Sequence, residues 1–387
     1  MQFSFSFPCE RPSCRALAQE EENYYTTQLI TYIGNKRSLI HQIKHIVDQV
    51  ALDLGQDTLV TFDGFSGSGV VSRVLKSKSK YIVSNDLEAY AQTISRCFLS
   101  NRNEVDLVDL QHHINLINQE INHMLTLDGP HGFIEELYAP HNDLNIQPGE
   151  RVFYTTYNAR KLDLIRQAIQ RYPEAQRPLF LGPLLSEASI HANTPGVFKG
   201  FYKNPSTGIG MFGGQGQHAL SRIKGEIHLK LPILSQFNVP FDVYQEDINL
   251  LVDQLDDSFD LAYLDPPYNQ HPYGSNYFML NLINHYQRPQ QMSKVSGIPT
   301  DWTRSKYNSR KSVFDSFEHL IAHLKAKYIL ISYNSEGFVS KDQLCHLLGQ
   351  FGQYYEFEIK YNAFKGSRNL HKRKIHVKEY LFLLKKK

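Results

Sequence analysis

Apolar residues along the chain recur at two spacings, one typical of helices and one typical of strands. In residues 36–52 the apolar positions follow helical spacing, which predicts an amphipathic helix; they are Leu39, Ile43, Ile46, Val47 and Val50. Residues 59–63 (LVTFD) form a β-rich run that leads into the glycine-containing segment 64–69 (GFSGSG). Because Val70, Val71 and Val74 follow, this part predicts a strand, a glycine loop and a helix packed back on a sheet.

Further strands and helices continue this alternation. We expect strands at residues 81–84, 259–264 and 328–332 and a helix at 315–327. Residues 354–361 and 377–384 predict an antiparallel pair joined by a basic loop at 365–374. Strands that alternate with helices indicate a mostly parallel α/β sheet, whose ligands bind at the carboxyl ends of the strands.

The α/β alternation lapses between about residues 88 and 239. This stretch holds one clear helix, marked by Ile114, Ile117, Ile121 and Leu125, and a region rich in Gly, Pro and aromatic residues at 196–216. We interpret it as an inserted, mostly helical domain. The predicted organisation is then a flexible tail at 1–22, an α/β domain made of 23–87 and 240–387, and the insertion at 88–239.

Composition excludes several classes of protein. With 41% hydrophobic and 21% charged residues, the 387 residues suit a globular protein, and no stretch suggests a membrane span or a signal peptide. The four cysteines, Cys9, Cys14, Cys97 and Cys345, lie too far apart for paired metal knuckles and are too few for a disulfide framework. We therefore expect a cytoplasmic protein without a metal site.

The net charge of +2 hides an uneven distribution of charge. Residues 365–387 hold nine Lys and Arg against one acid, Glu379, whereas residues 231–268 hold eight acids and no Lys or Arg. The basic segment suits phosphate contacts, although its last three lysines also fit a solvated tail. The acidic segment suits a cationic or neutral ligand.

The glycine loop and the acids near it suit a nucleoside cofactor. Glycine lets the backbone pass close to a ligand, and Asp86, nineteen residues after Gly67, is placed to accept hydrogen bonds from ribose hydroxyls. The loop lacks the Lys-Ser/Thr ending of a phosphate-binding loop, and Asp63 would repel a pyrophosphate but attract a cation. S-adenosylmethionine, a sulfonium without phosphates, fits. Taken alone, a glycine turn after a strand is often only a tight connection.

Asp265, Pro266, Pro267 and Tyr268 (DPPY) follow the predicted strand 259–264. Two prolines there are locally unfavourable, because neither can donate to a strand ladder, so the motif suggests function. The Asp265 carboxylate and the Pro266 carbonyl could accept both hydrogens of an exocyclic amine, and Tyr268 offers a ring on which a base can stack. A carboxylate is too weak a base to deprotonate such an amine beforehand, so methyl transfer should precede proton loss.

These motifs together resemble the D12 class, or Dam-like, adenine-specific DNA methyltransferases. Residues 32–37 (YIGNKR) resemble the family's N-terminal cofactor motif, 63–69 its FxGxG-type loop, 246–248 (EDI) its adenine contact, and 331–334 (ISYN) the strand after DPPY. Asp86 falls where the family places its ribose acid. The resemblance, which spans residues 32–384, implies a Rossmann-like α/β fold, S-adenosylmethionine as cofactor, and methylation of adenine N6 in duplex DNA after base flipping.

The resemblance and the residues together assign candidate sites. The catalytic residues are Asp265, Pro266, Pro267 and Tyr268. The cofactor-binding residues are Tyr32, Gly34, Lys36, Asp63, Phe65, Ser66, Gly67, Asp86, Asp247 and Asp265. The DNA-binding residues are Lys199, Arg222 and Lys224 in the insertion, which the family uses for target recognition, and Lys365, Arg368, Lys372 and Arg373 in the basic loop. Tyr273, Tyr277 and Phe278 are candidates for the pocket wall, with plain packing the more favoured role.

Other functions stay open at this point. DPPY alone also suits methylation of cytosine N4, of RNA or of a protein amide, whereas residues 32–37 and the motif order favour adenine in DNA. A DNA-binding protein with a vestigial cofactor site is a third reading, against which the intact Asp86 and Asp265 argue. We expect a monomer that acts on double-stranded DNA as the partner of a restriction endonuclease.

Overall fold

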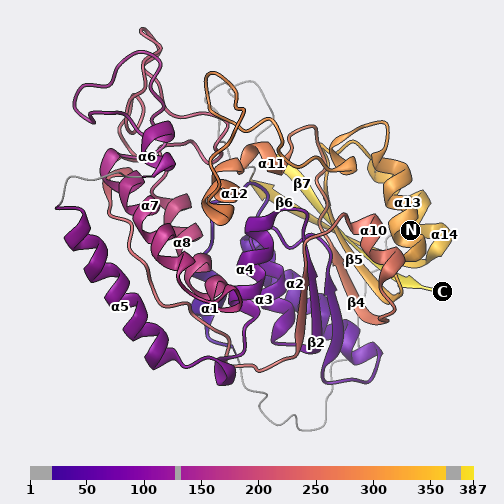
Figure 1. Cartoon of the computed structure of the whole chain (residues 1–387). Helices are drawn as coiled ribbons and strands as arrows, with labels where there is room; N and C mark the ends of the chain where they lie inside the picture. The colour runs from indigo at the N-terminus through magenta and orange to yellow at the C-terminus, as the bar shows by residue number, and fades with distance from the viewer. Residues whose placement is uncertain (1–19, 127–131, 363–375) are drawn as a thin grey trace.

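The computed structural model describes residues 20–126, 132–362 and 376–387. Within them, seven strands form one sheet in the order β3-β2-β1-β4-β5-β7-β6, with helices on both faces (Figure 1). The strands are β1 (Leu59–Asp63), β2 (Ser79–Asn85), β3 (Phe241–Tyr244), β4 (Phe259–Leu264), β5 (Ala326–Asn334), β6 (Gly352–Asn362) and β7 (His376–Lys386). The predicted Rossmann-like α/β fold is confirmed.

The helices connect the strands and cover the sheet, and most of the region between β2 and β3 is helical. Those at the sheet are α1 (Glu22–Thr26), α2 (Ile40–Asp53), α3 (Val70–Lys76), α4 (Ala89–Leu99), α10 (Ile248–Gln254), α13 (Val313–His323) and α14 (Lys341–Phe351). Between β2 and β3 the chain also forms α5 (Leu107–Met124), α6 (Phe133–Tyr138), α7 (Thr156–Gln170), α8 (Arg177–Ile190) and α9 (Leu220–Lys224). Two short helices, α11 (Tyr273–Asn276) and α12 (Phe278–His285), follow β4.

Strand pairing agrees with the predicted mixture of parallel and antiparallel strands. β1 pairs in parallel with β2 and β4, β2 with β3, and β4 with β5. β7 is antiparallel to both β5 and β6, so the predicted terminal hairpin is present, although its basic loop at 365–374 lies outside the described residues. From β1 the chain adds β2 and β3 on one side of the sheet and then returns to add β4 and β5 on the other side. In such folds a crevice opens between the two central strands where the order reverses, here β1 and β4.

Alternating side chains of the strands supply two separate cores. In β5, Leu330 packs with α2, α3 and α4 on one face, whereas Ile329 and Ile331 pack with α10, α13 and α14 on the other. Successive side chains of a strand point to opposite faces, so a strand covered on both sides reads as a continuous apolar run. This explains the YILIS and LAYL segments.

The region between β2 and β3 is mostly helical. α4 packs against α3, β2 and β3 and so covers the sheet, although the predicted insertion begins at residue 88; α4 also contacts α8. The helices α5 to α8 lie to the left of the sheet in Figure 1. α8 is buried almost all round, which hides the amphipathic period that would have predicted it. The division into domains stays a prediction.

Two elements differ from the sequence expectation. β3 is a short edge strand with the sequence FDVY, in which one position is exposed and three are half-buried, so its pattern was too weak to predict. The helix expected at 315–327 ends at His323, because Ala326 already begins β5. Among the described helices, none combines the length and apolar character that crossing a membrane would need.

The burial of β5 makes a stability prediction. Leu330→Ala removes a side chain that is 0% exposed in an interior strand of the sheet and should lower the free energy of unfolding by about 2–5 kcal/mol. Leu250→Ala in α10 is the matched control, because Leu250 is 50% exposed and its loss should cost about 0.5 kcal/mol. Urea unfolding of both variants measures the difference, and equal costs would contradict the assigned core.

Candidate active site

The carboxyl ends of β1, β2 and β4 open into one cleft, which we call the main cleft. Its empty volume, open mouth included, is about 850 Å³. Nine of the ten predicted cofactor residues line it: Tyr32, Gly34, Lys36, Phe65, Ser66, Gly67, Asp86, Asp247 and Asp265. Parallel strands bring these distant segments together, because their carboxyl ends meet at the same edge of the sheet.

The glycine loop after β1 forms part of the cleft wall and packs closely against Tyr32. Gly67 has a φ of +49°, a conformation that favours glycine, and a Cβ there would lie 2.9 Å from the ring of Tyr32. Its N–H donates to Oδ2 of Asp86 at 2.8 Å, and the N–H of Glu88 donates to Oδ1 at 2.9 Å. The backbone therefore fixes the plane of the Asp86 carboxylate. Burial raises the pKa of Asp86 to about 6, against the effect of these backbone hydrogen bonds.

Asp63, the tenth predicted cofactor residue, is not in the wall of the main cleft. It is fully buried behind the glycine loop, where Oδ2 accepts a hydrogen bond from Ser72 at 2.6 Å. Oδ1 has no hydrogen-bond partner within the described residues. Burial raises the pKa of Asp63 to about 7, and the neighbouring carboxylates Asp265 and Asp86 add to the effect. Its role in cofactor binding stays a prediction.

Lys36 holds the catalytic candidate Asp265. Its Nζ lies 3.1 Å from Oδ1 of Asp265 and 2.9 Å from Oε1 of Glu379 on β7, and it donates to the Gly34 carbonyl at 3.1 Å. Burial opposes its charge, but the two carboxylates raise the pKa of Lys36 well above its usual value. Burial raises the pKa of Asp265 to about 6, although Lys36 opposes the shift. We expected Lys36 to contact the cofactor; it lines the main cleft, and its contacts within the protein are to Asp265, Glu379 and the Gly34 carbonyl.

The DPPY segment separates the main cleft from a second hollow, the clamp cavity, whose empty volume is about 1000 Å³. Pro267 and Tyr273 line both spaces. Pro266 is buried and lines neither space, and its carbonyl receives no hydrogen bond from the described residues; its role as an acceptor for the base stays a prediction. Tyr268 lines the clamp cavity and meets Tyr333 edge-on, with ring centroids 6.1 Å apart.

Aromatic side chains form the partition beside DPPY. Tyr32 stacks on Tyr273, with centroids 5.0 Å apart, and on Tyr277, with centroids 4.7 Å apart. Tyr277 is fully buried and its hydroxyl accepts from the Ile33 N–H at 2.7 Å, while Phe278 belongs to the hydrophobic core. The favoured packing role fits Tyr277 and Phe278, whereas Tyr273 also faces both spaces.

Sequence reasoning missed several wall residues. Thr303, Ser305, Tyr307 and Asn308 come from the long segment between α12 and α13, and Glu88 follows β2. Glu88 is buried, accepts from Asn281 at 2.7 Å and from Thr303, and burial raises its pKa to about 7. The sequence held one signal for the segment that contributes Thr303 to Asn308. Residues 287–312 hold six Lys and Arg against one acid, which is unusual for a loop that only connects two helices.

The predicted DNA-binding residues lie in three different settings. Lys199 lines the clamp cavity, and Lys224 is exposed at the end of α9. The guanidinium of Arg222 donates to the carbonyls of Ile190 and Ala192, which gives it a structural role; its contact with DNA stays a prediction. Lys365, Arg368, Lys372 and Arg373 lie outside the described residues.

The strand order, the acid after β2 and the DPPY segment after β4 define a Rossmann-like S-adenosylmethionine-dependent methyltransferase. The sequence model of the D12 class N6 adenine-specific DNA methyltransferases matches residues 32–347, and the chain belongs to this family. The methyltransferase class implies S-adenosylmethionine as methyl donor, and the family implies DNA as substrate.

Individual relatives extend over nearly the whole chain. The Type II methyltransferase M.NlaIII of Neisseria lactamica is 30% identical over 92% of this chain and 99% of its own length. The Type II methyltransferase M.CviAII of Paramecium bursaria Chlorella virus 1 is 28% identical, with coverages of 92% and 98%. The Type II methyltransferase M.FokI of Planomicrobium okeanokoites is 25% identical over 92% of this chain, which spans 52% of that longer protein.

The close approach at Gly67 predicts a specific defect. Gly67→Ala should weaken S-adenosylmethionine binding at least about tenfold, because the added Cβ meets the Tyr32 ring and displaces the N–H that holds Asp86. Gly55→Ala is the matched control, since Gly55 also has a positive φ, +64°, but has nothing within 4 Å of its added Cβ. Calorimetric titration of both variants measures the effect; unchanged affinity in Gly67→Ala would refute this account of the loop.

Proposed function

We propose that this chain methylates N6 of an adenine flipped out of duplex DNA, at a specific sequence, with Asp265, Pro266 and Tyr268 holding the base. The observation that carries the proposal is the position of DPPY as a partition between two cavities. Such a partition lets a methyl donor and a methyl acceptor approach each other from opposite sides.

The main cleft fits S-adenosylmethionine by charge as well as by size. Its wall holds the acids Asp86, Glu88, Glu246, Asp247 and Asp265, with Lys36 as the basic residue among its lining side chains. Three of these carboxyls are buried enough to have raised pKa values, so a cationic ligand relieves an existing electrostatic cost. Asp86 would hold the ribose hydroxyls, Asp247 and Ile248 would flank the adenine ring, and Gly67 leaves room for the ligand.

The residues of the clamp would orient and activate the target amine. When bound, the cofactor supplies an electrophilic methyl group on its sulfonium. The Asp265 carboxylate and the Pro266 carbonyl accept the two amine hydrogens and so direct the nitrogen lone pair toward the main cleft. The ion pair with Lys36 favours the charged form of Asp265, and this carboxylate would stabilise positive charge as it develops on the amine. The proton leaves after methyl transfer, when the nitrogen has become acidic.

The clamp cavity suits the flipped base. Pro195, Val197 and Lys199 of the predicted insertion line it together with Tyr268 and His271, which would bring the insertion to the reacting centre. Base flipping costs a few kcal/mol, and stacking on Tyr268 would offset part of that cost. We infer that the insertion reads the target sequence and that Lys224 and the basic segment 287–312 contact the phosphates.

The biological setting we propose is a restriction-modification system, in which the chain is the modification enzyme and acts as a monomer. Support comes from M.NlaIII, M.FokI and M.CviAII, which are all named Type II methyltransferases. A single candidate recognition region beside a single clamp is compatible with methylation of one strand at a time.

Nucleoside analysis tests the proposed chemistry. After incubation of duplex DNA with labelled S-adenosylmethionine and the enzyme, the label should appear in N6-methyladenine, and N4-methylcytosine as the sole product would contradict the proposal.

Asp265→Asn should lower kcat on the order of 10²–10³-fold, because it removes a charged acceptor from the amine. Asp342→Asn, an exposed acid on α14, is the control and should keep full activity.

The raised carboxyl pKa values predict pH-dependent cofactor binding. A bound cation favours the charged forms of Asp86, Glu88 and Asp265, so binding releases protons, and affinity should rise with pH through about 6–7. S-adenosylhomocysteine lacks the sulfonium charge and should show a weaker dependence. Calorimetry at about pH 5.5, 6.5 and 7.5, in buffers of different ionisation enthalpy, measures the affinity and the number of protons released. If affinity depended on pH identically for the two ligands, the link between the sulfonium charge and the carboxyl groups would be excluded.

A further inference from the structure

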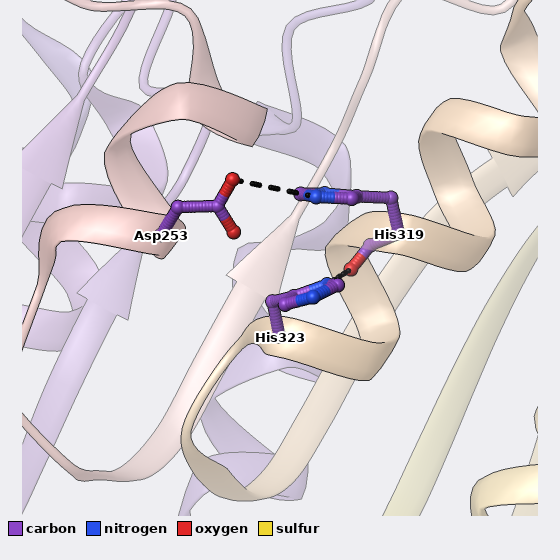
Figure 2. A group of neighbouring side chains, drawn as sticks. All are labelled: Asp253, His319 and His323. Carbon is purple, nitrogen blue, oxygen red and sulfur yellow. Dashed lines mark hydrogen bonds and ion pairs between the residues drawn. The ribbon is translucent and has the colours of Figure 1, made fainter.

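A compact group of metal-ligating side chains lies on the outer surface of the sheet layer, between α10 and α13. Figure 2 shows Asp253 on α10 facing His319 and His323, which lie one turn apart on α13. Each of the three offers a ligand atom, and these atoms all lie within 4.8 Å of one another. None of the three lines the main cleft or the clamp cavity.

The geometry of the group brings the three side chains toward one point. Nε2 of His319 is 3.4 Å from Oδ2 of Asp253, and the two imidazole rings stack with centroids 4.0 Å apart. Side chains four residues apart on a helix point from the same face, so the His319 and His323 rings share one side of α13. All three remain accessible to solvent, so an ion can enter without any opening of the fold.

Hydrogen bonds around the group orient the rings. Nδ1 of His323 is 2.8 Å from the His319 carbonyl, so it donates there and leaves the Nε2 lone pair free for an ion. Nδ1 of His319 is 3.1 Å from the amide of Asn249, which directs Nε2 of that ring toward Asp253. Metal binding through this Nε2 places the ring hydrogen on Nδ1, so the Asn249 amide must then present its oxygen.

We propose that Asp253, His319 and His323 bind a divalent transition metal ion of the Zn²⁺ type. Two imidazoles and one carboxylate are a ligand set that Zn²⁺ accepts, with water in the remaining position, whereas Mg²⁺ requires oxygen ligands. The sequence-based expectation of no metal rested on the cysteines alone. The His-x₃-His spacing within a predicted helix was visible, but the carboxylate comes from a separate segment.

The ion would join two walls of the main cleft. α10 begins at Ile248, which lines the cleft, and Asn249 donates to the Ser316 carbonyl of α13 at 2.9 Å. The Tyr307 hydroxyl, from the wall segment before α13, donates to Oδ1 of Asn249 at 3.1 Å. Because the Asn249 amide turns its oxygen to His319 when the metal binds, it gives up its donation to Ser316. The metal link would replace that contact between α10 and α13, and its role is structural.

Zinc titration tests the proposal independently of methylation. The full chain, freed of any affinity tag and stripped with a chelator, is titrated with ZnCl₂ by calorimetry and, separately, with MgCl₂. We expect one saturable Zn²⁺ site per chain and no corresponding Mg²⁺ site. His323→Ala, His319→Ala and Asp253→Asn should each lower the Zn²⁺ affinity at least about tenfold, because each removes a ligand.

The chain offers a matched control on another helix. His41 and His45 on α2 have the same spacing, but no described carboxylate completes a three-ligand group with them. His41→Ala should keep the Zn²⁺ affinity, and Zn²⁺ should raise the Tm of the wild type and of His41→Ala but not of His323→Ala. The absence of saturable binding, an unchanged affinity in His323→Ala or Asp253→Asn, or an equal loss in His41→Ala would each overturn the proposal.

Discussion

The buried ammonium of Lys36 between the carboxylates of Asp265 and Glu379 is the interaction on which the site depends. It joins the N-terminal motif, the carboxyl end of β4 and the first half of β7, three segments that share no local structure. Removing one member of such a buried group leaves an unpaired charge, which is far more costly than the net gain of the intact pair. The main effect of the Lys36–Asp265–Glu379 group is therefore to fix the position of the Asp265 carboxylate. Its net contribution to the stability of the fold is smaller.

The local parts of this architecture were predictable, whereas the contacts between them were not. β1, the glycine loop and β4 were predicted because their patterns extend over five to ten neighbouring residues, and strand periodicity then brought Asp86 and Asp265 to one edge. Glu379 was visible only as the single acid of a basic segment. Its pairing with Lys36 depends on β7 lying antiparallel beside β5, and no local pattern carries that information.

The main cleft illustrates how a binding site opposes stability. Burial raises the pKa values of the cleft residues Asp86, Glu88 and Asp265, so each of these carboxyls favours the fold when protonated and loses that contribution as the pH rises through about 6–7. The same burial makes the ionised forms of these carboxyls costly in the folded chain. In the function proposed above, a cationic cofactor would offset this cost, so the charge of the ligand would be linked to the stability of the folded chain.

The position of β7 in the sheet has a consequence for the order of synthesis. β6 is made before β7 but lies outside it, so β6 cannot join the sheet until β7 has emerged and paired with β5. Until then the edge of β5 stays open to other strands, and Lys36 lacks Glu379. A ribosome-bound chain can hence complete its glycine loop early, yet Lys36 can pair with both Asp265 and Glu379 only after residue 379 has been translated.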